Sequence, residues 1–166
     1  RSSKRVVLGA TAFQRQQEEN LVTKCHHESN GPPLKAFQFV AAPPARKWQQ
    51  YAQETVKALQ HIVGEEPAAA GLFPGLDLHD QLAIIVRCAG DMADLEPLLR
   101  QELEAAFPGR YELKTAAQAS EACSFVGDGE QHGERQWMVL DELTQLDGME
   151  RLIVVCVALD ASMEQE

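Results

Sequence analysis

The feature that most constrains the fold is a short apolar run in residues 81–90, QLAIIVRCAG, with helix-like patterns on both sides of it. A continuous apolar run bounded by turn residues is typical of a strand that is covered on both faces. Between residues 47 and 63, apolar residues recur at spacings of three and four, which predicts an amphipathic helix that ends near Gly64. After the run, apolar residues with the same spacing predict a second helix that extends to Phe107. The sequence therefore predicts a buried strand between two packed helices.

The second helix is expected to start at Asp91 or Asp94, since either carboxylate can cap a helix N-terminus. Pro97 then falls in the first turn of the helix. A proline is tolerated there because its missing N–H would have no helical partner in any case.

The other segments complete an alternating order of strands and helices. Strands are predicted at residues 34–42, 111–116, 137–143 and 152–160, and a short helix at residues 116–122. This alternation predicts an α/β domain with a mostly parallel sheet flanked by helices. We expect residues 1–34 to be an N-terminal helix and loop segment, and residues 35–166 to form the α/β domain.

The composition predicts a folded core and argues against some classes of function. A length of 166 residues fits one domain, and 45% hydrophobic with 24% charged residues is usual for a globular protein. The formal net charge of -10 argues against strong nucleic-acid binding by this chain alone, because phosphate binding needs clustered Lys and Arg. No stretch approaches the roughly 18 apolar residues of a membrane span, so no membrane partner is expected. The chain begins without Met, and we expect it to be part of a longer protein.

The four cysteines, at positions 25, 88, 123 and 156, are far apart in the sequence. Cys88 and Cys156 lie in or beside apolar runs, which is typical of reduced, buried cysteines rather than of disulfides. A cytoplasmic or nuclear location is therefore expected.

The segment from residue 137 to residue 160, WMVLDELTQLDGMERLIVVCVALD, combines a strand, a polar turn and a second strand. This pattern resembles motif V of the superfamily 1 helicases in their Upf-like and Schlafen-like forms, with DGME at residues 147–150 as the turn. The order of the preceding elements is similar to that of the second RecA-like domain of these motors, over about residues 35–160. The resemblance thus implies a RecA-like domain, of the P-loop NTPase type, in a nucleic-acid-dependent ATPase.

The resemblance also implies roles for individual residues. Gly148 would let the backbone approach the nucleotide, and Glu150 would offer a carboxylate to the ribose hydroxyls. Arg15 is the candidate for the motif IV arginine at the nucleotide, and the nucleic-acid contacts fall at Glu142 and Thr144. Family members usually carry Thr where this chain has Glu142, and a carboxylate there repels a phosphate.

The chain lacks the G-x-x-x-x-G-K-[ST] sequence that cradles the β and γ phosphates of a nucleotide. We therefore expect it not to hydrolyse ATP alone. ATP and Mg²⁺ would bind only together with an upstream RecA-like domain of the same protein, and RNA or DNA is the other implied partner. The arginine-bearing motif VI is expected beyond Asp160.

Two other functions stay open. A degenerate helicase-like domain, kept as a regulatory or protein-interaction module without nucleotide binding, is favoured by Glu142 and by the acidic net charge. A flavodoxin-like or Rossmann-like ligand domain would need a Gly-rich first turn between strand and helix, which the sequence does not show.

Other candidate sites have weaker patterns. The run CHHES at residues 25–29 does not have the spacing of zinc ligands, so no metal site is predicted. His79 and Asp80 are either a base with the residue that orients it, or a polar entry to the following strand.

Overall fold

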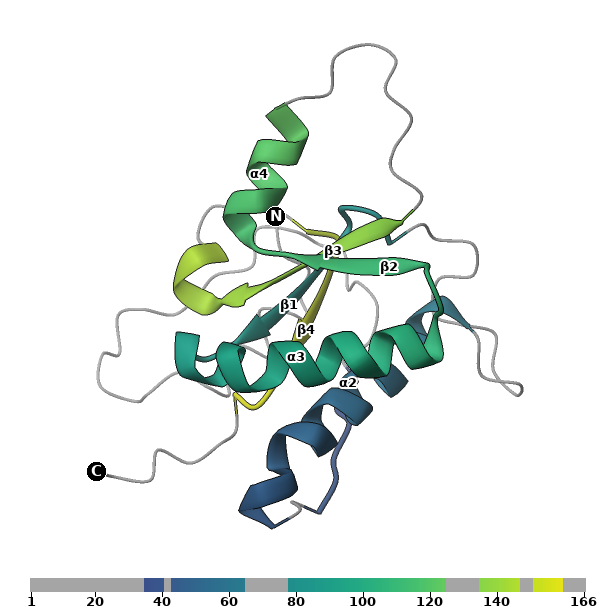
Figure 1. Ribbon diagram of the computed structural model, residues 1–166, viewed down its shortest axis with the longest axis vertical. Coiled ribbons are helices and arrows are strands. Elements are labelled where there is room, and N and C mark those ends of the chain that lie inside the picture. Colours follow the sequence, from purple (N-terminus) through teal and green to yellow (C-terminus); the bar gives the residue numbers. More distant parts are fainter. Residues whose placement is uncertain (1–34, 41–42, 65–77, 125–134, 147–150, 160–166) are drawn as a thin grey trace, which may run out of the picture. The chain divides into compact units, whose positions relative to one another are not determined.

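The computed structural model describes residues 35–40, 43–64, 78–124, 135–146 and 151–159. The chain separates into two compact units, Arg1–Phe39 and Val40–Glu166. All of the described helices and strands lie in the second unit (Figure 1).

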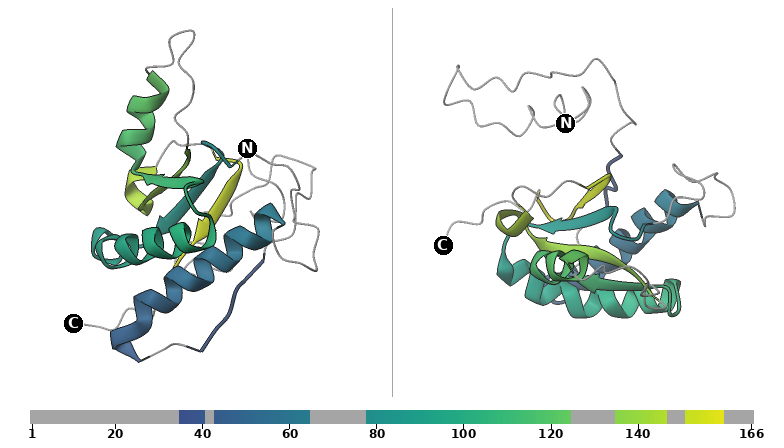
Figure 2. Two further views of the ribbon diagram at one scale, coloured as in Figure 1. Left: turned by 45° about the vertical axis from the view of Figure 1, so that its right-hand side comes forward. Right: turned by 90° about the horizontal axis from the view of Figure 1, so that it is seen from above.

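A four-stranded sheet forms the centre of the second unit (Figure 1, Figure 2). The strands are β1 (Leu82–Val86), β2 (Tyr111–Lys114), β3 (Gln136–Glu142) and β4 (Ile153–Cys156), in the spatial order β2-β3-β1-β4. β1 pairs in parallel with both β3 and β4, and β2 pairs in parallel with β3. The predicted α/β fold with a parallel sheet flanked by helices is confirmed.

The apolar run forms the interior strand β1, as predicted. Leu82, Ile84 and Val86 are fully buried on one face of the sheet. Ala83 and the half-buried Ile85 contact the smaller core on the opposite face. A strand buried on both faces needs apolar residues at successive positions, which explains why this run does not alternate with polar residues.

Helices α2 (Lys47–Val63) and α3 (Ala89–Ala106) cover one face of the sheet (Figure 1). Leu59 of α2, together with Leu95 and Leu99 of α3, is fully buried in the main core. α2 ends at Gly64 as predicted, because the left-handed φ of 81° lets the Gly64 N–H donate to the carbonyl of Gln60 at 2.9 Å.

Helix α4 (Ala116–Ser124) lies on the opposite side of the strands from α2 and α3 (Figure 1). Its small residues Ala116 and Ala119 pack with Trp137 and Val139 of β3. The β4 side of this face is open, since Val154 is 50% exposed and Cys156 is also exposed. The described part of the connection from β3 to β4 contains only the 3₁₀-helix η2 (Leu143–Leu146), so it supplies no covering α-helix.

The strand predicted at residues 34–42 is wrong. Residues 35–40 have no regular secondary structure, and Val40 is 90% exposed. Aromatic and β-branched residues favour a strand only where a neighbouring strand and a buried face are present. Here the carbonyl of Val40 instead accepts a hydrogen bond from Gln50 Nε2 of α2, at 2.9 Å.

α3 begins before both of its predicted caps. Its N-cap residue is Cys88, which makes no side-chain capping bond, and Asp91 lies within the first turn. Pro97 therefore lies inside the helix, and its predicted place in the first turn is wrong, as is the cap at Asp94. The missing N–H of Pro97 frees the carbonyl of Ala93, and both residues are exposed, so water can hydrate that carbonyl.

The prediction that Cys88 and Cys156 are buried is also wrong. Both are free thiols, with Cys88 half-buried at the start of α3 and Cys156 exposed on the open face of an edge strand. The chain around the Cys156 sulfur still removes enough water to raise the pKa of this thiol.

Candidate functional site

The ends of the four parallel strands form one edge of the sheet, which we call the carboxyl edge. Ligands of open parallel sheets bind outside this edge, where loops and helix N-termini offer free backbone amides. The strand register places Val86 beside Glu142 and Ile85 beside Cys156. α3 and α4 both begin at this edge, after β1 and β2 respectively. The carboxyl edge is therefore the place to look for a site.

Asp141 is a buried polar residue of the carboxyl edge, at 7% exposure. One carboxylate oxygen accepts a hydrogen bond from the N–H of Ala116, the first residue of α4, at 2.9 Å. The other accepts from the N–H of Glu142 at 2.8 Å. A carboxylate is stable in this place because it faces a helix N-terminus and because both of its oxygens are hydrogen-bonded. Asp141 thus ties the end of β3 to the start of α4.

The same helix start carries a capping box from its own sequence. The hydroxyl of Thr115 accepts from the N–H of Gln118 at 3.3 Å, and the Gln118 side chain accepts from the N–H of Thr115 at 2.9 Å. Together with Asp141, these bonds engage the N–H groups of Thr115, Ala116 and Gln118 at the start of α4.

A second carboxylate lies in the first turn of α3. The guanidinium of Arg87 donates two hydrogen bonds to Asp91, Nε to Oδ2 at 3.0 Å and Nη2 to Oδ1 at 3.2 Å. The Asp91 side chain is only 9% exposed, whereas that of Arg87 is 40% exposed. These hydrogen bonds, and the charge of the Asp91 carboxylate, raise the pKa of Arg87 above its ordinary value.

The two helix N-termini of the carboxyl edge are thus already supplied with negative charge from the chain itself. A phosphate at α4 would meet the carboxylate of Asp141, and a phosphate at α3 would approach the carboxylate of Asp91 in the first turn. Both contacts are unfavourable, since like charges repel strongly where water is excluded. As described, this edge is not built to bind a phosphate at a helix terminus.

Of the sequence-predicted contacts, Glu142 and Thr144 are found at the carboxyl edge. Glu142 is the last residue of β3 and is half-buried, with one carboxylate oxygen accepting from Gln145 Nε2 at 3.2 Å. Thr144 is exposed in η2. The two residues are therefore close in the chain and open to a ligand, but the first of them is an acid.

Gly148, Glu150 and Arg15, the predicted nucleotide contacts, lie outside the described residues. The described residues on either side of the segment 147–150 contact the rest of the domain. Leu146 is buried in the smaller core beneath α4, and Arg151 forms an ion pair with Asp80 at 2.7 Å.

His79 and Asp80 lie before β1, at the opposite edge of the sheet from the helix starts. His79 Nδ1 accepts from the N–H of Trp137 at 3.4 Å, and the two rings contact edge to face with centroids 5.0 Å apart. Asp80 pairs with Arg151. The contacts with Trp137 and Arg151 fit the polar entry to the strand.

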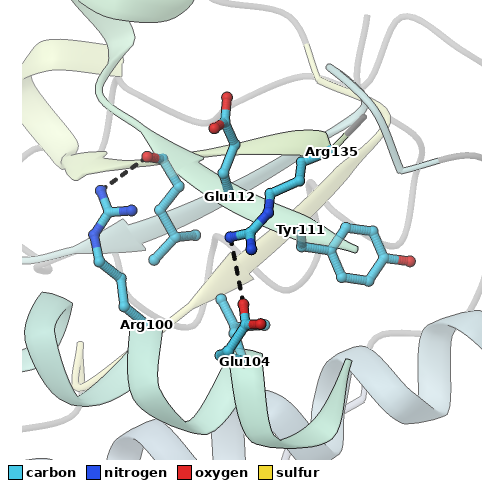
Figure 3. A pocket seen from close by; sticks show the side chains of 7 residues that line it. Arg100, Glu104, Tyr111, Glu112 and Arg135 are labelled. Atoms are coloured by element: carbon cyan, nitrogen blue, oxygen red, sulfur yellow. Dashed lines mark hydrogen bonds and ion pairs between the residues drawn. The ribbon is translucent and has the colours of Figure 1, made fainter. Parts of the chain in front are cut away.

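A shallow hollow of about 150 Å³ lies beside the edge strand β2 (Figure 3). Arg100 and Arg135 line it, but both are engaged within the chain. Arg100 pairs with Glu96 at 2.7 Å and donates to the carbonyl of Leu113, while Arg135 lies 3.4 Å from Glu104. The positive and negative groups balance, so the hollow offers no net charge to a ligand.

Within the described ranges, no group of three His, Cys, Asp or Glu side chains is placed to hold a metal ion. The helices in the same ranges include none that is long and apolar enough to cross a membrane.

The sequence-based search missed Asp141 and the pair of Arg87 with Asp91. The acidic residue at an inward-facing position of the run WMVLDE is a sequence signal that could have indicated a buried carboxylate. Its partner Ala116 is distant in the sequence, however, so only the fold reveals what the carboxylate binds.

Comparison of this chain with known protein families, with curated proteins and with solved structures gives no significant match.

Proposed function

We propose that this chain is the second RecA-like domain of a helicase-like, nucleic-acid-dependent ATPase, and that it supplies one wall of an ATP site between two such domains. The observation that carries the proposal is the connectivity around DGME at residues 147–150. In the chain this segment lies between β3 and β4, which are both parallel to β1 and pair with it on opposite sides. The resemblance to motif V requires this arrangement of strand, polar turn and strand.

The chain's own residues would bind and orient the nucleotide rather than cleave it. Gly148 would give the backbone close access, Glu150 would accept hydrogen bonds from the ribose hydroxyls, and Arg15 would approach the phosphates. Mg²⁺ and the β and γ phosphates would be held by an upstream RecA-like domain, since this chain lacks the P-loop sequence.

The test compares ATP hydrolysis by the 166-residue chain with hydrolysis by the natural protein that contains it, each with and without single-stranded RNA or DNA. We expect no hydrolysis by the chain alone, and nucleic-acid-stimulated hydrolysis by the full protein. Hydrolysis by the chain alone, or none by a full protein that binds nucleic acid, would overturn the proposal.

A second candidate function is a helicase-like module that regulates or binds other proteins without binding a nucleotide. The carboxylates of Asp91 and Asp141 at the two helix N-termini favour this candidate, because they repel a phosphate. Glu142 in the place of a phosphate-binding threonine also favours it. The absence of nucleotide binding by the full protein would select this candidate over the first.

A further inference from the structure

Most of the described lysines and arginines are neutralised by a carboxylate of the same chain. Such pairing is expected in an acidic protein with a net charge of -10. The described cations with a carboxylate within 3.4 Å are Lys57, Arg87, Arg100, Lys114, Arg135 and Arg151.

Arg46 and Lys47 differ from these. They are consecutive at the start of α2, and neither has a carboxylate partner among the residues that the structure describes. The first turn of α2 also contains no acidic residue. Two cations at a helix N-terminus oppose the helix dipole, at a cost of some tenths of a kcal/mol each. Helix stability therefore does not explain why they are there.

An aromatic pair adjoins the two cations. The rings of Trp48 and Tyr51 lie with their centroids 5.6 Å apart and their planes inclined by 42°. Lys47 Nζ lies 5.0 Å from the centre of the Trp48 ring. Both aromatic residues are half-buried and pack against the main core, so part of each side chain is open to solvent. Positive charge and partly exposed aromatic side chains thus occur together in one place.

We propose that Arg46, Lys47, Trp48 and Tyr51, which we call the α2 patch, bind single-stranded nucleic acid. The two cations would contact successive phosphates, and the rings would stack on unpaired bases. An acidic peptide would use the cations but would gain little from the rings, so the aromatic pair favours a nucleic acid. The α2 patch gives the proposed function a strand-binding surface in place of the acidic carboxyl edge. It rests on that function only for the choice of ligand.

The test measures fluorescence anisotropy of labelled oligothymidine and oligouridine, each about 15 nucleotides long, on titration with the 166-residue chain. The matched pair of variants is Lys47→Glu and Lys57→Glu, which change the charge equally on the same helix. We expect Lys47→Glu to weaken binding about tenfold at low salt and Lys57→Glu to change it less than twofold. The variant Arg46→Ala/Lys47→Ala should also lower the slope of log K against log salt by about 1.4, the value for two single-strand phosphate contacts.

Trp48→Ala should weaken binding by about 5- to 150-fold through lost stacking, with far-UV circular dichroism used to show that the variant is folded. An equal loss of oligonucleotide affinity in Lys47→Glu and Lys57→Glu, or no binding by the unchanged chain, would overturn the proposal. So would binding of an acidic peptide but not of either oligonucleotide. A higher affinity for one of the two oligonucleotides shows whether the α2 patch prefers DNA or RNA. Because the assay contains no ATP, a negative result here is distinguishable from a failure of the proposed ATP site.

Discussion

Replacement of Asp141 by alanine is expected to destabilise the domain by about 2–4 kcal/mol. The carboxylate accepts from two backbone N–H groups, of Ala116 at 2.9 Å and of Glu142 at 2.8 Å. A hydrogen bond to a charged group contributes about 1.5–3 kcal/mol, and the loss of a helix cap costs about 0.5–2 kcal/mol. The sum is reduced because the variant no longer has to bury a carboxylate at 7% exposure. Asp141→Asn keeps one acceptor oxygen, so we expect about half of the loss.

Urea unfolding followed by far-UV circular dichroism measures this loss. With an m-value of about 2 kcal/mol/M, a loss of about 3 kcal/mol lowers the urea midpoint by about 1.5 M. Asp94→Ala is the matched control, since Asp94 is an exposed aspartate of α3 and should shift the free energy of unfolding by less than about 0.5 kcal/mol. If Asp141→Ala unfolds within that same margin of the unchanged chain, the carboxylate does not fasten β3 to α4 and the reasoning is wrong.

Three further predictions concern other parts of the domain. Gly90→Ala should raise the free energy of unfolding by about 0.5–1 kcal/mol, because alanine favours a helix and its Cβ would lie at an ordinary contact distance of 3.9 Å from the Cys88 sulfur. Gly109→Ala should lower the free energy of unfolding by about 1 kcal/mol, because the φ of Gly109 is +66°. Urea midpoints of the two variants that move in the same direction would refute both predictions. In a variant with the other cysteines replaced by serine, Cys156 should be alkylated by iodoacetamide with a pH profile shifted above that of a cysteine peptide, because its raised pKa leaves less thiolate at a given pH; a profile at or below that of the peptide would contradict this. Val154→Lys should change the free energy of unfolding by less than about 0.5 kcal/mol since Val154 is 50% exposed, whereas Ile84→Lys should prevent folding; strong destabilisation by Val154→Lys would show that this face is covered.

The elements with strong apolar periodicity were predictable from the sequence. α2, α3 and β1 each have enough apolar residues in one pattern to specify both the type of element and the buried face. Residues 35–40 were not predictable, because a strand depends on a partner that the local sequence does not contain. The start of α3 was missed for a similar reason. Cys88 is not a usual capping residue, so the sequence favoured the nearby aspartates.

The candidate site was less predictable than the fold. Glu142 and Thr144 were predicted as nucleic-acid contacts from the resemblance. The structure has them at the carboxyl edge, and their role stays a prediction. The occupation of α4 by Asp141 joins residues that are far apart in sequence, so it depends on the parallel pairing of β2 with β3. The placement of Asp141, which discourages a phosphate at α4, is therefore a property of the fold rather than of any motif.

The most direct test of the proposed function is titration calorimetry of the natural full-length protein with a non-hydrolysable ATP analogue and Mg²⁺, comparing the unchanged protein with Glu150→Ala and with the exposed-glutamate control Glu121→Ala. Loss of a charged hydrogen-bond acceptor at the ribose should raise the dissociation constant about tenfold or more in Glu150→Ala, and Glu121→Ala should bind as the unchanged protein does. Equal affinity in all three proteins would remove Glu150 from the nucleotide. Absence of binding in all three would contradict the ATP site altogether and leave the protein-interaction module.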